Sequence, residues 1–202
     1  VDALVTTLAG HNGKPAAVVQ RLDGASQLQP QVAHCAELGQ TLARMHMAAQ
    51  DFALQQPNLR GLPWWNETVP LVLNYIPEHL QALLQSELQH QNDVAQYSAY
   101  SQLPKGPVHA DLFRDNAMFV GERLSGIFDF YFAGVDTWLF DLCVVINDWC
   151  IDLATGELDG PRLHALLDAY QAVRPLTPDE RRLIPDLVRA AALRFWISRL
   201  WD

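Results

Sequence analysis

The chain has 202 residues, of which 50% are hydrophobic and 18% charged, so it can form one packed domain or a large lobe of one. The formal net charge is −9 and only two lysines occur, so the basic stripe of a nucleic-acid-binding protein is absent. No apolar run reaches the roughly 18 residues of a membrane span. Three cysteines without a Cys-x-x-Cys pair predict buried free thiols and a cytoplasmic protein.

The first two elements are predicted to be strands. Residues 1–8 and 16–22 are short runs rich in Val, Leu and Thr, and the segment 9–15 between them has the composition of a turn. A single hairpin does not support a stable sheet, so partner strands are expected elsewhere. Because Val1 already lies in what reads as the middle of a sheet, we expect the chain to be a fragment.

Helices are predicted for most of the remaining chain. In the first of them, over residues 31–50, apolar side chains recur at helical spacing and form one stripe. Residues 61–65 are rich in breakers and predict a connection, and Pro77 must open a turn or kink a helix. The other predicted helical stretches are 69–100, 139–150, 161–173 and 178–201.

A small β-hairpin is predicted inside this helical region. The segment 104–107 ends the preceding helix, and the runs 117–120 and 124–130 flank a tight turn. Polar residues cluster at the mouths of the hairpin, above all in the loop that precedes it. We therefore expect the chemistry of the protein to lie in this part of the chain.

The residues of this loop fit phosphoryl transfer. Transfer of a phosphoryl group to a hydroxyl needs a carboxylate that accepts the hydroxyl proton, and oxygen ligands for Mg²⁺ on the phosphates. His109-x-Asp111 is followed five residues later by Asn116, and Asp129 comes 13 residues after Asn116 beyond the hairpin. The spacing predicts Asp111 as the base, with Asn116 and Asp129 as the metal ligands. His109 would complete the catalytic set by bracing the loop through hydrogen bonds.

Two other interpretations of this loop stay open. Asp and Asn residues also form turns and helix caps without any catalytic role. The second interpretation is a hydrolytic metal site built on His109 and Asp111, although no second His lies nearby at metal-ligand spacing.

A resemblance narrows the interpretation. The sequence resembles the aminoglycoside phosphotransferase and choline kinase group of protein-kinase-like enzymes, and within that group the homoserine kinases of the kinase-like type. The segments that carry it are HADLFRDN at 109–116, SGIFDFYFA at 125–133, FDL at 140–142, NDWC at 147–150, AYQAVRP at 169–175 and LRFWISRL at 193–200.

The resemblance implies an α+β, protein-kinase-like fold, with a mainly helical C-terminal lobe, an inset β-hairpin and a remnant of the N-terminal lobe sheet. Residues 1–24 would end the N-terminal lobe and residues 25–202 would form the catalytic lobe. Gln20, Arg21 and Leu22 would be the hinge that meets the adenine of ATP. The phosphate-covering loop and strand lysine of the family are not found in this sequence.

Two further roles follow from the resemblance. Protein kinases place a Lys two residues after the base, where this chain has Phe113 followed by Arg114. Arg114 is predicted to offer its charge to the γ-phosphate, with a structural ion pair as the alternative. Asp141 is predicted to brace the catalytic loop from the start of a helix, with a plain helix-dipole role as the alternative.

An amino-acid substrate requires a carboxylate for its ammonium group and an arginine for its carboxylate. Asp148 is predicted for the first task and Arg194 or Arg199 for the second, with surface ion pairs as the alternative. Trp149, next to Asp148, is predicted to contribute to the pocket. Tyr131 and Trp196 are predicted to line it, with a core role as the alternative.

The predicted function is phosphorylation of the hydroxyl of L-homoserine by ATP and Mg²⁺, giving O-phospho-L-homoserine for threonine biosynthesis. No nucleic-acid or membrane partner is expected, and the sequence predicts no oligomeric state. One alternative is a kinase for another small alcohol, such as choline, an aminoglycoside or a sugar. Another is a catalytically dead fragment that acts as a binding module. A third is a lobe that pairs with an N-terminal lobe from a separate chain.

Overall fold

The structure, a computed structural model, describes residues 6–11, 14–18, 20–53 and 56–202, with side chains from residue 20 onward, and is mainly helical. Its α-helices are α1 (Val32–Ala48), α2 (Leu62–Val72), α3 (Glu78–Ala95), α4 (Ser98–Ser101), α5 (Trp138–Trp149), α6 (Gly160–Val173) and α7 (Pro178–Trp201). Short 3₁₀ turns are η1 (Leu73–Tyr75), η2 (Arg114–Asn116) and η3 (Phe130–Phe132). The strands are β1 (Thr6–His11), β2 (Lys14–Val18), β3 (Lys105–Val108), β4 (Ala117–Val120), β5 (Arg123–Ile127) and β6 (Gly134–Thr137).

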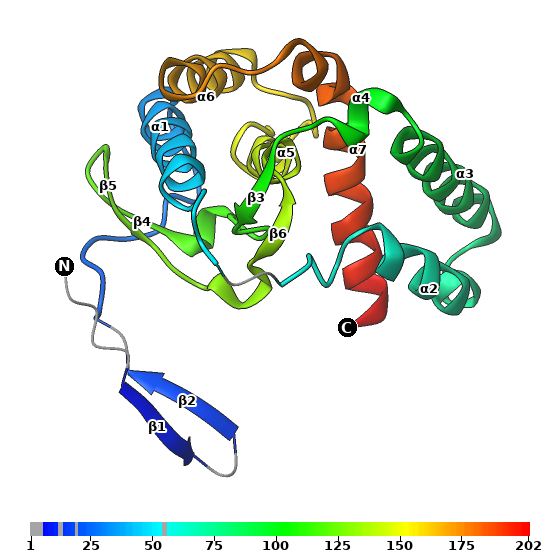
Figure 1. Ribbon diagram of the computed structural model, residues 1–202, viewed down its shortest axis with the longest axis horizontal. Helices are drawn as coiled ribbons and strands as arrows, with labels where there is room; N and C mark the ends of the chain where they lie inside the picture. The colour runs from blue at the N-terminus through cyan, green and yellow to red at the C-terminus, as the bar shows by residue number, and fades with distance from the viewer. Residues whose placement is uncertain (1–5, 12–13, 19, 54–55) are drawn as a thin grey trace.

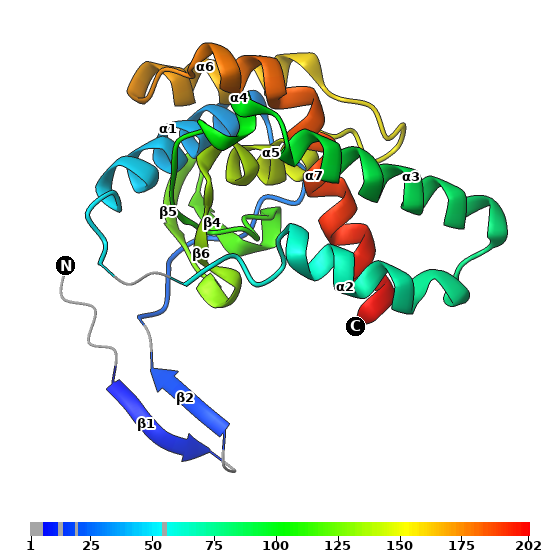
Figure 2. The same ribbon diagram turned by 45° about the vertical axis from the view of Figure 1, so that its right-hand side comes forward.

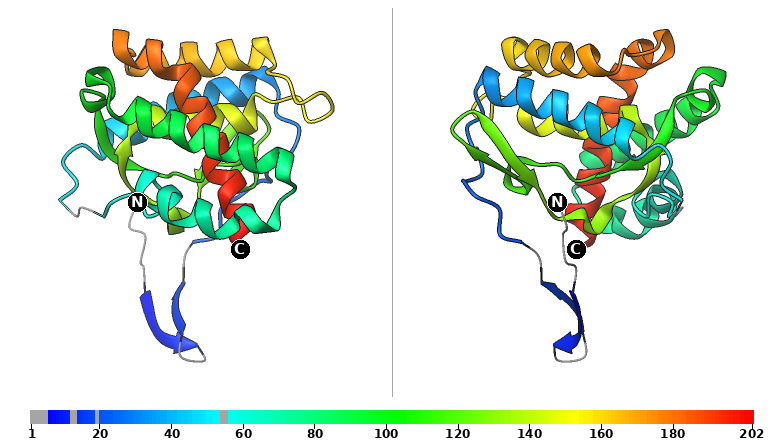
Figure 3. Two further views of the ribbon diagram at one scale, coloured as in Figure 1. Left: turned by 90° about the vertical axis from the view of Figure 1, so that its right-hand side faces the viewer. Right: turned by 60° about the vertical axis from the view of Figure 1, so that its left-hand side comes forward.

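Helix α5 forms the centre of the molecule. Its residues from Trp138 to Ile146 are all buried, and α1, α6 and α7 pack around it (Figures 1 and 3). Helices α1 and α6 run side by side at close range, because Gly39 of α1 lies against the backbone of Leu166. A Cβ atom at Gly39 would come within 2.3 Å of the Leu166 carbonyl oxygen. Helices α2 and α3 cover another side of α7.

Two small antiparallel sheets hold the predicted catalytic segment. Strand β3 pairs with β6, from Lys105 opposite Thr137 to Val108 opposite Gly134, and β4 pairs with β5 in the predicted hairpin. The loop between β3 and β4 therefore starts and ends on a strand. Strand β6 runs directly into α5, whose N-cap Thr137 accepts a hydrogen bond from the backbone N–H of Phe140. These connections position the loop against the start of the central helix.

The hairpin β1–β2 stands apart from the helical body (Figures 1 and 2). The chain then returns to the body, where Ala25 and Phe119 exchange two backbone hydrogen bonds of 3.0 and 2.9 Å. Strands are found in both predicted runs, but β1 ends at His11 and β2 begins at Lys14, both inside the segment expected to be a turn, and residues 20–22 are not in a strand. Among the described strands no partner pairs with this hairpin, contrary to the expectation, and β5 ends at Ile127 rather than at residue 130. Residues 1–5 of the predicted first strand lie outside the described residues.

The predicted helices are confirmed, and two boundaries differ. Residues 61–65 are not a connection, because Gly61 caps α2 and Pro63 lies in its first turn, where the missing N–H costs nothing. The segment 104–107, predicted only to end a helix, forms most of strand β3. Pro107 is compatible with a strand there because, among the described strands, β3 pairs with β6 alone and is therefore an edge strand. Pro77 opens α3 as its N-cap. All three cysteines are buried and free, and no described helix has the length and apolar character needed to span a bilayer.

Candidate active site

The loop between β3 and β4 is held by the carboxylate of Asp141, in the first turn of α5. The backbone N–H groups of His109 and Ala110 donate to its two oxygens at 3.0 and 2.7 Å. Ala110 has φ of 63°, a left-handed conformation that costs a non-glycine residue free energy. The two hydrogen bonds offset that cost and fix the direction in which Asp111 leaves the loop. Asp141 thus lies where a brace for the loop was expected.

Asp141 is itself held by a buried network of hydrogen bonds and one ion pair between side chains. His46 Nε2 forms a hydrogen bond with Asp141 at 3.0 Å, and His46 Nδ1 forms one with the Tyr170 hydroxyl at 2.8 Å. Arg174 donates to Tyr170 at 3.3 Å and pairs with the buried Glu180 at 2.7 Å. All five residues are buried, and they link the loop to the turn between α6 and α7. This network was not predicted from the sequence, although the spacing of Tyr170 in the last turn of α6 and Arg174 at its C-cap is a local signal for one of its contacts.

The charge of Asp141 is maintained by this network. Burial alone raises the pKa of the carboxyl group, but the hydrogen bond and positive potential of His46 outweigh it, with a further contribution from His109. The net pKa of Asp141 lies below its usual value. The residue is therefore an anion at neutral pH and accepts both loop N–H groups at full strength.

The metal-ligand candidates are brought together by Phe128. Its N–H donates to the carbonyl of Asn116 at 3.1 Å, and its carbonyl accepts from His109 Nε2 at 2.9 Å. Asp129 follows in a left-handed conformation with φ of 60° and is exposed. The Asn116 side chain donates to the Asp111 carbonyl at 2.8 Å, which leaves its amide oxygen as the atom able to bind a cation. His109 thus ties the loop to the segment that delivers Asp129.

These two side chains can supply one carboxylate and one amide oxygen. Across the described ranges no group of three or more His, Cys, Asp or Glu side chains is arranged to hold a metal. A pair of oxygen donors suits a hard cation that takes its remaining ligands from phosphates and water. The donor set fits such a cation and does not fit a closed protein-only metal site.

The carboxylate of Asp111 lies beside a buried arginine. Arg194 Nη1 of α7 is 3.5 Å from Asp111 Oδ1. Burial raises the pKa of Asp111, while the positive charges of Arg194 and His109 lower it, and the net shift is upward. Burial also lowers the pKa of Arg194 to about 10, which still leaves the guanidinium protonated at neutral pH. A half-buried carboxylate with a raised pKa, paired with a cation, is a suitable general base.

Comparison with known proteins agrees with this geometry. The model of the phosphotransferase enzyme family (APH) matches residues 3–176. The chain belongs to this family. The homoserine kinase of Polaromonas naphthalenivorans is 57% identical over 201 residues, which cover 100% of this chain and 64% of that protein. The homoserine kinase of Cupriavidus pinatubonensis is 58% identical over 94% of this chain and 59% of its own length. The chain thus spans about three fifths of the curated relatives it matches.

A solved structure shows the same fold. Amicoumacin kinase hAmiN, in complex with AMP-PNP, Ca²⁺ and Ami, superposes with a TM-score of 0.68 over 98% of this chain and 65% of its own, at 16% identity. The fold of the chain is therefore protein-kinase-like, and the described residues are dominated by the helical lobe, as predicted.

The structure does not turn Arg114 toward Asp111. Its buried guanidinium donates to the carbonyls of Leu28 and Ile151 at 3.0 and 2.9 Å, and to the carbonyl of Asp148. Its Nε lies 3.6 Å from the Asp148 carboxylate. These contacts revise the prediction that Arg114 meets the γ-phosphate. They favour the alternative role, a structural ion pair that ties the end of α5 to the segment before α1.

The residues predicted to bind the substrate differ in how far they are exposed and in which groups they contact. Trp149 is fully buried and donates to the Leu112 carbonyl at 3.1 Å, so the core role applies to it rather than the pocket role. The Asp148 carboxylate accepts from the backbone N–H of Arg114 at 2.7 Å but stays partly exposed. Arg199 is exposed and close enough to Asp148 to lower its pKa, which burial raises. Tyr131 is 82% exposed beside Asp129.

The predicted hinge lies at the edge of the β4–β5 hairpin. Gln20 and Arg21 are exposed, and the Leu22 side chain lies against Gly126, where a Cβ atom would come within 2.6 Å of it. The Asp23 carbonyl accepts from the Ser125 hydroxyl. The segment is thus anchored to the hairpin next to the loop, and adenine contact by residues 20–22 remains a prediction.

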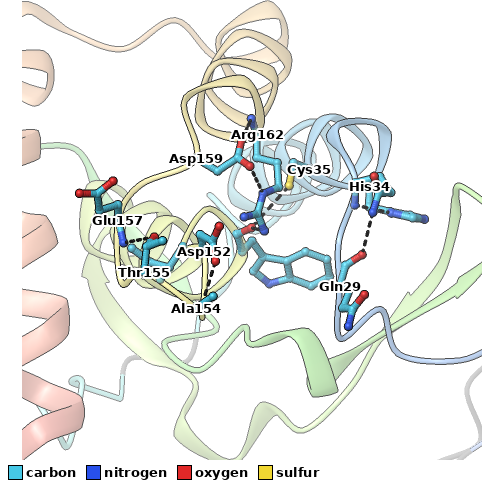
Figure 4. A network of polar contacts seen from close by, with 12 residues as sticks. Gln29, His34, Cys35, Asp152, Ala154, Thr155, Glu157, Asp159 and Arg162 are labelled. Carbon is cyan, nitrogen blue, oxygen red and sulfur yellow. Dashed lines mark hydrogen bonds and ion pairs between the residues drawn. The ribbon is translucent and has the colours of Figure 1, made fainter.

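A second polar network ties the start of α1 to the loop between α5 and α6 (Figure 4). Arg162 pairs with Asp159 at 3.0 Å and donates to the Trp149 carbonyl at 3.1 Å, while the Cys35 thiol points to the same carbonyl. A pocket of about 470 Å³ lies here, lined in part by Arg114 and Arg162. Both arginines already donate to backbone carbonyls, so this network stabilises the fold around the loop.

Proposed function

We propose that the protein containing this chain transfers the γ-phosphoryl group of ATP to the hydroxyl of L-homoserine and forms O-phospho-L-homoserine. The observation that carries the proposal is the pairing of Asp111 with Arg194 of α7 at 3.5 Å, beside Asn116 of the same loop and the segment after β5 that carries Asp129. One site then offers a base for the hydroxyl, and a cation that matches the carboxylate of an amino acid. The homoserine kinases that are 56–58% identical over nearly the whole chain support the same substrate.

The chemistry is assigned to the loop. Asp111 orients the substrate hydroxyl and accepts its proton, and the upward shift of its pKa, caused mainly by burial, makes it a stronger base. Asn116 and Asp129 would hold Mg²⁺, which when bound with ATP neutralises charge on the transferred phosphoryl group. The Asp141 brace keeps the loop in place while this occurs, so little reorganisation is needed during the reaction.

The remaining groups orient the substrate and the nucleotide. Arg194 binds the substrate carboxylate, and the exposed part of Asp148 serves the ammonium group, with Arg199 nearby as a second cation. Residues 20–22 would meet the adenine. The free buried thiols and the need for ATP are consistent with the cytoplasm as the compartment.

The experiment is an assay of ADP release with the protein in its full encoded length, tested on L-homoserine, choline, an aminoglycoside and a simple sugar. L-homoserine is expected to give the highest kcat/KM, with metal-dependent turnover. A higher kcat/KM for any other acceptor would replace homoserine with that substrate class. Calorimetry with Mg-ATP separates the dead-module alternative, because absence of metal-dependent nucleotide binding would rule out a kinase.

A further inference from the structure

A second arginine, Arg60, lies near the candidate active site and was not found from the sequence. It precedes α2, and its backbone N–H donates to the Asn58 side chain at 3.0 Å. Its guanidinium stacks on the Trp64 ring, with the central carbon 4.3 Å from the ring centroid. Trp64 packs against the hydrophobic core, so Arg60 has a fixed support rather than a solvated surface position. The side chain is 18% exposed.

Arg60 and Arg194, the arginine pair, share one aromatic ring. The guanidinium carbon of Arg194 lies 4.8 Å from the centroid of Phe132, and that of Arg60 lies 5.7 Å from it. Phe132 ends the η3 turn that begins directly after Asp129. The arginine pair is therefore adjacent to both the proposed base and the proposed metal site, although its members come from segments 134 positions apart.

Each member of the arginine pair keeps an unused donor. Among the residues that the structure describes, Arg60 Nη1 and Arg194 Nη2 are buried nitrogens without a hydrogen-bond partner. Buried polar groups are nearly always paired in native proteins, so two unpaired cationic donors around one ring point to a missing acceptor. A pocket of about 430 Å³ opens beside Arg60, lined by Gln56, Leu59, Arg60, Tyr131 and Phe132, and Arg194 lies against the Phe132 ring that forms one of its walls.

The charge balance also points to an anion. Arg60 and Arg194 repel each other, and the charge of Arg60 helps to lower the pKa of Arg194. Asp111 compensates Arg194 at 3.5 Å, and Asp202 lies 3.3 Å from Arg60 but is 60% exposed and solvent-screened. Because Asp111 must remain free to accept a proton, a second negative group is needed to balance the pair. A carboxylate on the substrate meets that need.

We propose that Arg60 and Arg194 together bind the carboxylate of the acceptor substrate, and that Arg60 selects an α-amino acid over an amino alcohol without a carboxylate. The inference deepens the proposed function and rests on it for the identity of the acceptor. In L-homoserine the hydroxyl oxygen and the carboxylate carbon are separated by four bonds of about 1.5 Å, hence by about 5 Å when extended. A hydroxyl at Asp111 therefore places the carboxylate within reach of the arginine pair. Two arginines give planar, multidentate recognition that a lysine cannot match.

The test compares two acceptors with the protein in its full encoded length. L-homoserine has the carboxylate, and 3-amino-1-propanol has the same hydroxyl and ammonium without it. Arg60→Gln is expected to raise KM for L-homoserine about 10- to 100-fold, the range for a lost charge-assisted hydrogen bond. KM for 3-amino-1-propanol should be unchanged. Arg60→Lys should recover part of the affinity for L-homoserine, and the exposed Arg182→Ala serves as the matched control.

A merely structural role gives a different result. If Arg60 only supports Trp64, Arg60→Gln lowers the melting temperature and impairs both acceptors equally, which would overturn the proposal. An unchanged KM for L-homoserine would overturn it as well.

A second measurement separates this proposal from the proposed function. L-2-aminobutyrate keeps the carboxylate and ammonium of homoserine but lacks the hydroxyl, so its binding by calorimetry does not depend on turnover. Loss of its binding in Arg60→Gln supports the arginine pair even if L-homoserine is not phosphorylated. Wild-type affinity for L-2-aminobutyrate in Arg60→Gln would overturn the pair even if L-homoserine is a good substrate.

Discussion

The loop that carries Asp111 and the aromatic pocket that holds the arginine pair differ in how their polar groups are satisfied. In the loop, the N–H groups of His109 and Ala110 end on Asp141, and the N–H of Asp111 ends on His109. In the pocket, one nitrogen of each arginine is buried and unpaired, whereas the only such side-chain atom in the described loop is Arg114 Nε, which lies 3.6 Å from the Asp148 carboxylate. A loop whose backbone groups are satisfied is organised before any substrate arrives, whereas a pocket with unused donors is completed by its ligand. If the proposed function holds, the same lobe combines a preorganised loop for catalysis with a pocket that the acceptor substrate completes.

The largest effect is expected at the base. Asp111→Asn keeps the shape of the side chain and removes its ability to accept a proton, so kcat should fall about 10²- to 10⁴-fold. The melting temperature should stay close to that of the wild type, because the variant also removes a charge that is costly to bury. Steady-state ADP release and thermal melting measure the two quantities. Asp115→Asn, at an exposed position of the same loop, is the control, and a fall in kcat of less than tenfold for Asp111→Asn would remove Asp111 as the base.

The rigidity of the loop can be broken at Asp141. Asp141→Asn leaves His46 and one loop N–H without their charged acceptor, so the free energy of unfolding should fall by about 3 kcal/mol. Urea titration measures this, with Asp186→Asn as the control, since the half-buried pair of Asp186 and His90 is worth less than about 1 kcal/mol.

The pH dependence of that loss gives a sign test. The pKa of Asp141 is lower in the folded protein than its ordinary value of about 3.9. The stability that its ionised form contributes is therefore fully present above that value and is lost as the pH falls through the folded pKa. The stability difference between wild type and Asp141→Asn should shrink on acidification, and a difference that grows would contradict the role assigned to the ionised carboxylate.

The structural role of Arg114 predicts a smaller effect on stability and little effect on kcat. Arg114→Met removes the hydrogen bonds to Leu28, Asp148 and Ile151, so the free energy of unfolding should fall by about 1–3 kcal/mol. The kcat of the folded variant should change less than tenfold. An arginine that stabilises the transferred phosphoryl group contributes about 10³-fold or more, so a loss of that size would restore the role expected from the sequence.

The smallest effect is a shift in a pH profile. Burial raises the pKa of Asp111, and the charge of Arg194 partly opposes that rise. Arg194→Gln removes the opposing charge, so the acid limb of kcat/KM should move to higher pH. A pH titration of kcat/KM with 3-amino-1-propanol avoids the loss of carboxylate binding. An acid limb that does not move, or that moves to lower pH, would show that Asp111 does not carry the titration or does not sense Arg194.

The catalytic end was largely predictable because its information is local. His109, Asp111 and Asn116 lie within eight residues, and a short hairpin returns the chain to Asp129. Helices with clear apolar stripes were predictable for a similar reason. The pairing of β3 with β6 was missed, since each strand has four residues and β3 contains both Gly106 and Pro107, which are typical of turns.

The direction of long side chains was not predictable. Arg114 directly follows Phe113 of the catalytic loop, yet its guanidinium turns toward carbonyl groups 34 and 37 positions further along the chain and one 86 positions earlier. A flexible side chain follows whichever acceptors the packed fold brings near, and sequence spacing does not report them. The same holds for the buried network from Asp141 to Glu180, because its members come from α1, α5, α6 and α7 and meet only when these helices pack together.

The sequence by itself determined most helices and the spacing of the candidate loop residues, because helix periodicity and the His-x-Asp-x₄-Asn spacing depend on residues close together in the chain, and its resemblance to a known family supplied the fold class. Only the tertiary structure decided which arginines lie beside Asp111 and Phe132. Arg194 and Arg60 meet around Phe132, while Arg114 turns into the body of the lobe. The physical reason is that a buried guanidinium needs carbonyl, carboxylate or aromatic partners, and in this protein those partners come from segments far apart in the sequence.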